Sequence, residues 1–332
     1  MGDARVAGRR ETETLAARGV TSSYEHQPVM VAEIVDLLRP ERGGVFLDAT
    51  VGGGGHAERL LAAADTVRLL GLDEDPDAVS AAGERLGRYG DRVRLERVNF
   101  RNASEELDQD PWLAEGLTGA LMDLGVSSKQ IDESASGFSF RPSTPLIMRM
   151  GGTTEGRRPA ADLLNSASEA ELGRIFREYG EERRWKKLAR EVVRLRGLRP
   201  FGESGDLVGA VQATLGPRAA PQDFARIFQA LRIAVNDELA ALEEGLLGIR
   251  DMLRTGGRLA VISYHSLEDR IVKREFREWS RSCVCPPELP ICRCRGVALG
   301  TTLTRRPLRP THAEITANSR SRSARLRVWE RA

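Results

Sequence analysis

The stretch VFLDATVGGGGHAERLLAAA, residues 45–64, decides the fold. It begins with a short apolar run that ends in an acid, Asp48, continues with four consecutive glycines and ends in a helical pattern. This order predicts a strand, a glycine loop and a helix. Glycine lets the backbone pass close to a ligand, and in a parallel α/β sheet this turn lies at the carboxyl end of a strand, where nucleotides bind. The stretch therefore predicts an α/β domain with a nucleotide site at that edge.

Strands and helices alternate on both sides of this stretch. Further strands are predicted at residues 67–72, 93–98, 117–124, 258–264, 301–306 and 323–329. Further helices are predicted at residues 28–38, from Pro76 onward, at 223–254 and at 266–280. Such alternation is typical of a mostly parallel sheet that is covered by helices on both faces.

The pattern changes between residues 135 and 222, where no strand-like run occurs. Helical periods appear instead at residues 160–165, 168–179 and 185–195. We therefore predict four segments along the chain. They are a disordered tail at 1–22, a first part of the α/β domain at 23–134, a helical insert at 135–222 and a second part of the α/β domain at 223–332, which carries a Cys/Arg-rich loop.

Composition excludes several classes of protein. The 332 residues are 41% hydrophobic and 30% charged, so the chain can bury a core and is neither disordered nor fibrous. No apolar run is long enough to span a membrane, and the first residues carry charges where a signal peptide needs an apolar segment. Four cysteines are too few for a disulfide framework. We expect a soluble, cytoplasmic protein that makes no membrane contact.

Positive charge is concentrated near the end of the chain. Residues 270–332 hold 15 Lys and Arg against 5 Asp and Glu, although the net charge of the whole chain is only +2. This segregation indicates a basic surface for a polyanion beside an acidic body. A merely solvated basic face is the alternative.

Two acids follow predicted strands at positions where a ligand would lie. Asp73 comes 21 residues after Gly52, a spacing that suits hydrogen bonds from a ribose diol of either NAD or S-adenosylmethionine. The dinucleotide fingerprint is incomplete, because Ala57 stands where its third glycine should be. Asp123 lies near the end of the next strand but one, where a carboxylate can orient a target amine and receive its proton. A capping role for Asp123 is the alternative.

All four cysteines lie close together in the sequence, as Cys283-x-Cys285 and Cys292-x-Cys294. Four thiolates can bind zinc, but pairs in structural zinc sites usually have two to four residues between them. The spacing therefore favours thiols without a metal over a zinc site or disulfides. Arginines that suit phosphate binding surround this loop. They are Arg281, Arg293, Arg295, Arg305, Arg306 and Arg309.

Seven motifs, in order between Tyr24 and Val328, resemble those of the bacterial 16S ribosomal RNA (cytosine N4)-methyltransferase family, RsmH or MraW. They are HQPVM (26–30), DATVGGGGH (48–56), MDLGVSSKQ (122–130), GFSF (137–140), YGEER (179–183), FQALRIAVNDEL (228–239) and SYHSLEDRIVK (263–273). The resemblance implies a Rossmann-like methyltransferase domain with an inserted all-helical domain that recognises RNA. It also implies S-adenosylmethionine-dependent methylation of the exocyclic N4 of a specific cytidine in 16S rRNA of the small ribosomal subunit, with no metal required.

The resemblance also places the site residues. The implied contacts to S-adenosylmethionine are Gly54, Gly55, His56, Asp73, Phe100, Asp123 and Gln130. We expect Asp123 and His265 to be catalytic, although His265 also fits a structural histidine. The expected RNA-binding residues are Arg226, Asn236, Tyr264, Arg305, Arg306 and Arg309. Tyr264 and His265 follow a strand, where they could stack on and hydrogen-bond a flipped base.

Two other functions stay open on the sequence alone. The first is an NAD-dependent oxidoreductase, which the incomplete glycine fingerprint disfavours. The second is a methyltransferase-like RNA-binding or assembly factor with little turnover.

Overall fold

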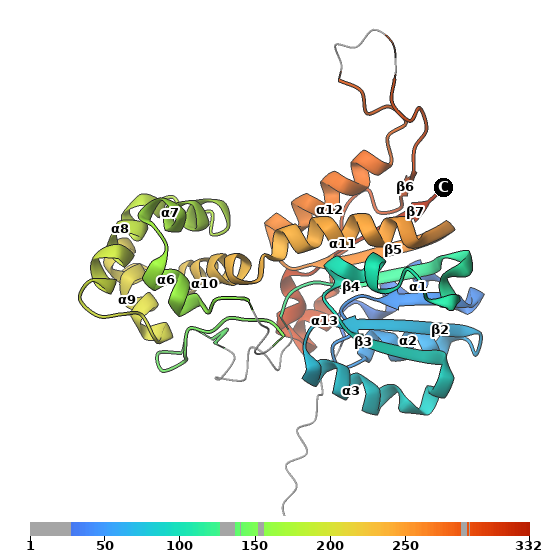
Figure 1. Ribbon diagram of the computed structural model, residues 1–332, viewed down its shortest axis with the longest axis horizontal. Coiled ribbons are helices and arrows are strands. Elements are labelled where there is room, and N and C mark those ends of the chain that lie inside the picture. Colours follow the sequence, from blue (N-terminus) through green and yellow to red (C-terminus); the bar gives the residue numbers. More distant parts are fainter. Residues whose placement is uncertain (1–27, 127–136, 140, 152–155, 287–290, 292) are drawn as a thin grey trace, which may run out of the picture.

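The computed structural model describes residues 28–126, 137–139, 141–151, 156–286, 291 and 293–332. Figure 1 shows two parts, a sheet that is covered by helices on both faces and a group of helices beside it. The predicted tail at 1–22, the predicted cofactor residue Gln130 and the cysteine Cys292 lie outside the described residues. Within these ranges, no helix is both long and apolar enough to cross a membrane.

The described sheet has seven strands in the order β3-β2-β1-β4-β5-β7-β6. The strands are β1 (Gly44–Asp48), β2 (Val67–Asp73), β3 (Val93–Arg97), β4 (Leu117–Asp123), β5 (Leu253–Ser263), β6 (Gly300–Thr302) and β7 (Arg325–Arg331). The first five are parallel, and β7 is antiparallel to both of its neighbours. Strand order reverses between β1 and β4, which is where doubly wound sheets bind ligands. The predicted Rossmann-like α/β class is confirmed.

Helices cover the two faces of the sheet and bury alternate residues of the strands. In β1, Phe46 packs in the apolar cluster of one face and Leu47 in that of the other. The first face carries α1 (Val31–Leu38), α2 (Gly55–Ala63) and α3 (Pro76–Leu86), and the second carries α4 (Ala103–Glu106), α11 (Glu238–Met252) and α12 (Ser266–Trp279). A short helix, α13 (His312–Ala317), connects β6 to β7. Short 3₁₀ segments lie at Pro40–Arg42, Gly87–Arg92, Phe100–Asn102, Pro111–Glu115 and Ser319–Ser323.

The helical group beside the sheet has an apolar core of its own. Its helices are α6 (Ala160–Ser166), α7 (Glu169–Glu178), α8 (Trp185–Arg196), α9 (Ser204–Leu215) and α10 (Pro221–Asn236). Buried residues such as Phe176, Leu188 and Leu231 form the core. The predicted helices at 160–165, 168–179 and 185–195 are confirmed. Helix α9 was not predicted, because its two glycines weaken the helical signal.

The single helix predicted at 223–254 is wrong, because the chain forms two helices, α10 and α11. Asp237 separates them in a left-handed conformation with φ of 52°. Short polar side chains tolerate this conformation, so the apolar period continues across the break without a glycine to mark it. Helix α10 packs in the core of the helical group, whereas α11 packs on the sheet. We propose that the insert extends to Asn236 rather than to 222.

Candidate active site

A cleft of about 130 Å³ lies at the carboxyl ends of β1, β2 and β4, where the strand order reverses. It is lined by Ala49, Thr50, Gly52, Asp73, Glu74, Asp75, Ala78, Val98, Asn99, Phe100, Asp123, Leu124, Gly125, Val126, Met150 and Tyr264. The structure thus brings four of the predicted site residues, Asp73, Phe100, Asp123 and Tyr264, into one cavity.

Carboxylates give the cleft its electrostatic character. Four of the residues that line it are acidic, and among the described residues no Lys, Arg or His lines it. Asp48 is buried at the end of β1, and burial raises its pKa to about 7. Burial also raises the pKa of Asp73 to about 6. Such a cleft favours a cationic ligand and opposes a diphosphate.

Asp73 joins the glycine loop to the start of α3. Its Oδ2 accepts a hydrogen bond from the amide of Gly52 at 2.9 Å, and its Oδ1 accepts one from the amide of Asp75 at 3.0 Å. Gly52 faces the cleft, whereas Gly54 and Gly55 do not line it. A Cβ on Gly54 would lie 3.3 Å from Leu86 of α3, and φ at Gly54 is +78°. Gly54 and Gly55 therefore shape the loop on the side away from the cleft.

Asp123 is held from two sides. Its amide donates to Thr50 Oγ1 at 2.7 Å, and its Oδ1 accepts the hydroxyl hydrogen of Tyr264 at 2.9 Å. Burial and the neighbouring Asp123 carboxylate raise the pKa of Tyr264 well above its usual value. The phenol therefore stays protonated and orients the carboxylate at the end of β4.

His56 lies behind Asp123, near the start of α2. Its Nε2 is 2.8 Å from the carbonyl oxygen of Val29, and its Nδ1 is 3.8 Å from Asp123 Oδ2. Burial lowers the pKa of His56 to about 4, so the ring is neutral at pH 7. Because a carbonyl only accepts, the proton is on Nε2, and Nδ1 presents a lone pair toward Asp123.

Phe100 lines the cleft from the 3₁₀ turn after β3 and rests against α11. A Cβ on Gly245 would lie 2.5 Å from Phe100 Cδ2. Glycine at position 245 therefore lets the ring approach the helix backbone closely, which fixes one wall of the cleft.

His265 occupies a capping position instead of the cleft wall. Its Nδ1 accepts a hydrogen bond from the amide of Glu268 at 3.4 Å, and its Nε2 lies 3.0 Å from Glu268 Oε1. The side chain of Glu268 in turn accepts from the amide of Tyr264. This geometry favours the structural histidine over the expected catalytic one.

Two predicted RNA-binding residues already have partners within the protein. The side chain of Asn236 accepts from the amide of Met150 at 2.8 Å and donates to the carbonyl oxygen of Met148 at 2.7 Å. Arg226 pairs with Asp223 at 2.7 Å and with Glu182 at 3.2 Å. Asn236 therefore places Met150 at the cleft, and Arg226 ties α10 to the segment between α7 and α8.

The other predicted RNA-binding arginines, Arg305, Arg306 and Arg309, are exposed. They follow β6, which runs parallel to β5 because both strands are antiparallel to β7. The chain therefore leaves β6 at the same edge of the sheet as the cleft. In the described part of the chain, no ion pair involves these three arginines.

Sequence reasoning missed several residues of this region. Asp48 shows the same signal as Asp73, an acid at the end of a strand, and could have been named. Thr50 and Met150 carry no such signal, because distant partners place them. A basic groove beside α10 was also missed. It is lined by Glu182, Arg183, Arg184, Leu215, Arg218, Ala219, Asp223 and Arg226.

Comparison with known proteins confirms the resemblance. The sequence model of the MraW methylase family matches residues 23–332. Three curated relatives are each called ribosomal RNA small subunit methyltransferase H. The protein of Gemmatimonas aurantiaca is 49% identical over 317 residues, 96% of this chain and 98% of the relative. That of Symbiobacterium thermophilum is 48% identical over 92% of this chain and 96% of the relative, and that of Heliobacterium modesticaldum is 46% identical over 93% and 99%. The chain therefore belongs to the MraW methylase family.

Proposed function

We propose that this protein uses S-adenosylmethionine to methylate the exocyclic N4 of a specific cytidine in 16S rRNA of the small ribosomal subunit. Membership of the MraW methylase family and the names of the curated relatives support methyl transfer to small-subunit rRNA. The observation that carries the choice of methyl donor is the acidic cleft at the carboxyl ends of β1, β2 and β4.

The charge of the cleft distinguishes between S-adenosylmethionine and NAD, the two ligands between which the sequence did not decide. S-adenosylmethionine carries a sulfonium and an ammonium group, whereas NAD carries an anionic diphosphate. Asp73, Asp75 and Asp123 would attract the first and repel the second. Asp73 and Phe100 both line the cleft. Asp73 would accept a ribose hydroxyl, and Phe100 would pack against the adenine. Gly54, Gly55 and His56 would support these contacts from behind the loop, and Gln130 is kept as a proposed contact from the resemblance.

The proposed chemistry depends on alignment, because the lone pair of the N4 amine is conjugated with the cytosine ring. S-adenosylmethionine supplies a methyl group on a positively charged sulfur. Asp123 would accept an N–H hydrogen bond from the amine. It would take the proton that leaves nitrogen as the carbon–nitrogen bond forms and the methyl–sulfur bond breaks, which leaves a neutral thioether. Thr50 and Tyr264 hold Asp123 in place for this role. We assign His265 to positioning Tyr264 through the cap of α12.

RNA would approach the cleft between two basic surfaces. Arg305, Arg306 and Arg309 lie at the same edge of the sheet as the cleft, and Arg183, Arg184 and Arg218 line the groove beside α10. Arginine side chains suit phosphate contacts. Arg226 and Asn236 would shape this surface through the contacts they make within the protein.

Two assays test the proposal. Calorimetry with S-adenosylmethionine and with NAD should show binding of the first alone, and a nicotinamide-binding protein would reverse this result. Isolated small subunits should accept a labelled methyl group, with large subunits as the control substrate. S-adenosylmethionine binding without any transfer to small-subunit RNA would instead support the assembly-factor function.

A further inference from the structure

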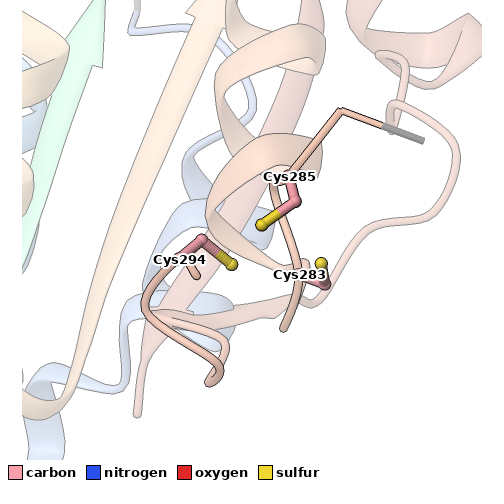
Figure 2. Close-up of side chains that lie close together, drawn as sticks. All are labelled: Cys283, Cys285 and Cys294. Atoms are coloured by element: carbon pink, nitrogen blue, oxygen red, sulfur yellow. The ribbon is translucent and has the colours of Figure 1, made fainter. Parts of the chain in front are cut away.

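Three cysteine side chains meet in the loop between α12 and β6, about one helix length away from the cleft. The Sγ atoms of Cys283, Cys285 and Cys294 lie within 4.8 Å of one another. Figure 2 shows the three sulfurs converging from two arms of the loop, with Cys283 and Cys285 on one arm and Cys294 on the other. Helix α12 begins beside Tyr264 and has 14 residues, so its far end is about 21 Å away from the cleft. The cluster therefore takes no part in the chemistry proposed above.

The distances between the sulfurs suit a tetrahedral metal. Zinc–sulfur bonds of about 2.3 Å place thiolates about 3.8 Å apart around zinc, so these sulfurs need to close by at most about 1 Å. Thiolates are soft ligands and select zinc over magnesium or calcium. The sequence spacing argued against zinc because a single residue separates Cys283 from Cys285. In the structure Cys294 lies on the facing arm of the loop, so the short spacing between Cys283 and Cys285 does not prevent three sulfurs from surrounding one metal ion.

Backbone amides of the loop point at two of the sulfurs. The amide of Val284 donates to Cys294 Sγ at 3.3 Å, and the amide of Arg293 donates to Cys285 Sγ at 3.3 Å. Each hydrogen bond joins one arm to the other. Donors that surround metal-bound ligands orient them and stabilise their negative charge. The loop thus supplies backbone donors that would stabilise thiolates, as well as the cysteine ligands themselves.

The described residues of this loop form no apolar core of their own. No described residue from Arg281 to Leu299 is buried, and the apolar side chains of Ile291 and Val297 are 69% and 64% exposed. Its base is fixed by Arg295, which donates to the carbonyl oxygens of Glu278 and Arg281. Segments without an apolar core commonly fold around a metal, because the free energy of metal binding replaces that of a core.

We propose that Cys283, Cys285 and Cys294 bind one zinc ion, which fixes the arginine-bearing loop between α12 and β6. The proposal assigns three ligands. Cys292 lies outside the described residues and is not among them. The site is structural, and its loss should leave the cleft unchanged.

Metal content is the first test. The whole chain, purified with a reductant and without chelator, should hold about one zinc per molecule by mass spectrometry of elements, as a structural zinc site requires. The triple variant Cys283→Ser, Cys285→Ser and Cys294→Ser should lose this zinc, and Ser282→Ala in the same loop should keep it. Cobalt in place of zinc should give thiolate charge-transfer absorption only in the protein that keeps Cys283, Cys285 and Cys294. Absence of zinc and of this absorption, or a disulfide among these cysteines, would overturn the proposal.

Proteolysis gives a second readout. Trypsin cleavage after Arg293 and Arg295 should be slower by about tenfold or more with zinc than after chelation, because bound metal holds the loop closed. In the triple variant, chelation should change nothing. S-adenosylmethionine affinity should be equal in both proteins, so failure of the zinc site and failure of the proposed function give different results. Equal cleavage with and without zinc would contradict the proposal.

Discussion

The acidic cleft and the helical group differ in whether the predicted site residues line a cavity or contact other residues of the protein. In the cleft, Asp73 and Asp123, both predicted from strand ends, and Phe100, predicted from the resemblance, line one cavity. At the helical group, Arg226 and Asn236 were expected to bind RNA, but both make their polar contacts within the protein. A strand end fixes where a residue lies in the sheet, whereas position along a helix says little about which distant segment will partner its side chain.

Asp123→Ala should give the largest effect, because the variant removes the group that orients the amine and accepts its proton. We expect the single-turnover rate of methyl transfer to fall by about 10²- to 10³-fold. RNA affinity should change far less. Quench-flow measurement with small subunits tests this, with filter binding as the control. A lost RNA affinity beside an unchanged chemical step would make Asp123 a binding residue.

Asp73→Ala should give the second largest effect, on the binding of S-adenosylmethionine. The variant loses the proposed ribose acceptor and also the contacts to the amides of Gly52 and Asp75. Hydrogen bonds to charged groups contribute about 1.5 to 3 kcal/mol, so S-adenosylmethionine affinity should fall by about 10- to 100-fold. Calorimetry measures it, and circular dichroism checks that the variant is folded. A folded variant with unchanged affinity would remove Asp73 from the site.

Exchange of Arg305, Arg306 and Arg309 for Gln sharpens the comparison between exposed and paired arginines. The triple variant should bind RNA about tenfold more weakly, and the slope of log affinity against log salt should fall by up to about 0.7 to 0.9 per lost phosphate contact. Arg258→Gln is the matched control, because its guanidinium pairs with Glu330 and lies on neither of the proposed RNA surfaces. That variant should lower stability and keep the slope. Equal slopes in all three proteins would leave RNA binding to the insert alone.

The smallest expected effect is a pH dependence of cofactor binding. With the pKa of Asp73 at about 6, half of this carboxylate is protonated at pH 6, so affinity for a cationic ligand should be about twofold lower there than at pH 8. The stability of the ligand-free protein should change in the opposite direction with pH. Because burial raises the pKa values of Asp48 and Asp73 above their unfolded values, stability should decrease as pH rises toward about 7. Thermal melts with and without S-adenosylmethionine should diverge as pH rises. A constant difference would show that these carboxylates do not face the ligand.

Local signals predicted the sheet and its edge well. The pair Asp75-Pro76 marks the start of α3, and the Asp75 side chain accepts from the amide of Asp77 as a helix cap does. The break at Asp237 carried no local signal, because apolar residues continue at helical spacing on both sides of it. Roles that depend on long-range contacts were not predictable either. Tyr264 was expected to bind RNA, yet its hydroxyl orients Asp123, which is 141 residues away in the sequence.

Nucleoside mass spectrometry of rRNA tests most directly whether the acidic cleft methylates cytidine N4. Small subunits from a strain that lacks this protein should miss one N4-methylated cytidine in 16S rRNA. The intact gene should restore the methyl group, and the Asp123→Ala gene should not. An unchanged nucleoside profile on deletion, a missing methyl group on another base or atom, or full restoration by Asp123→Ala would contradict the account.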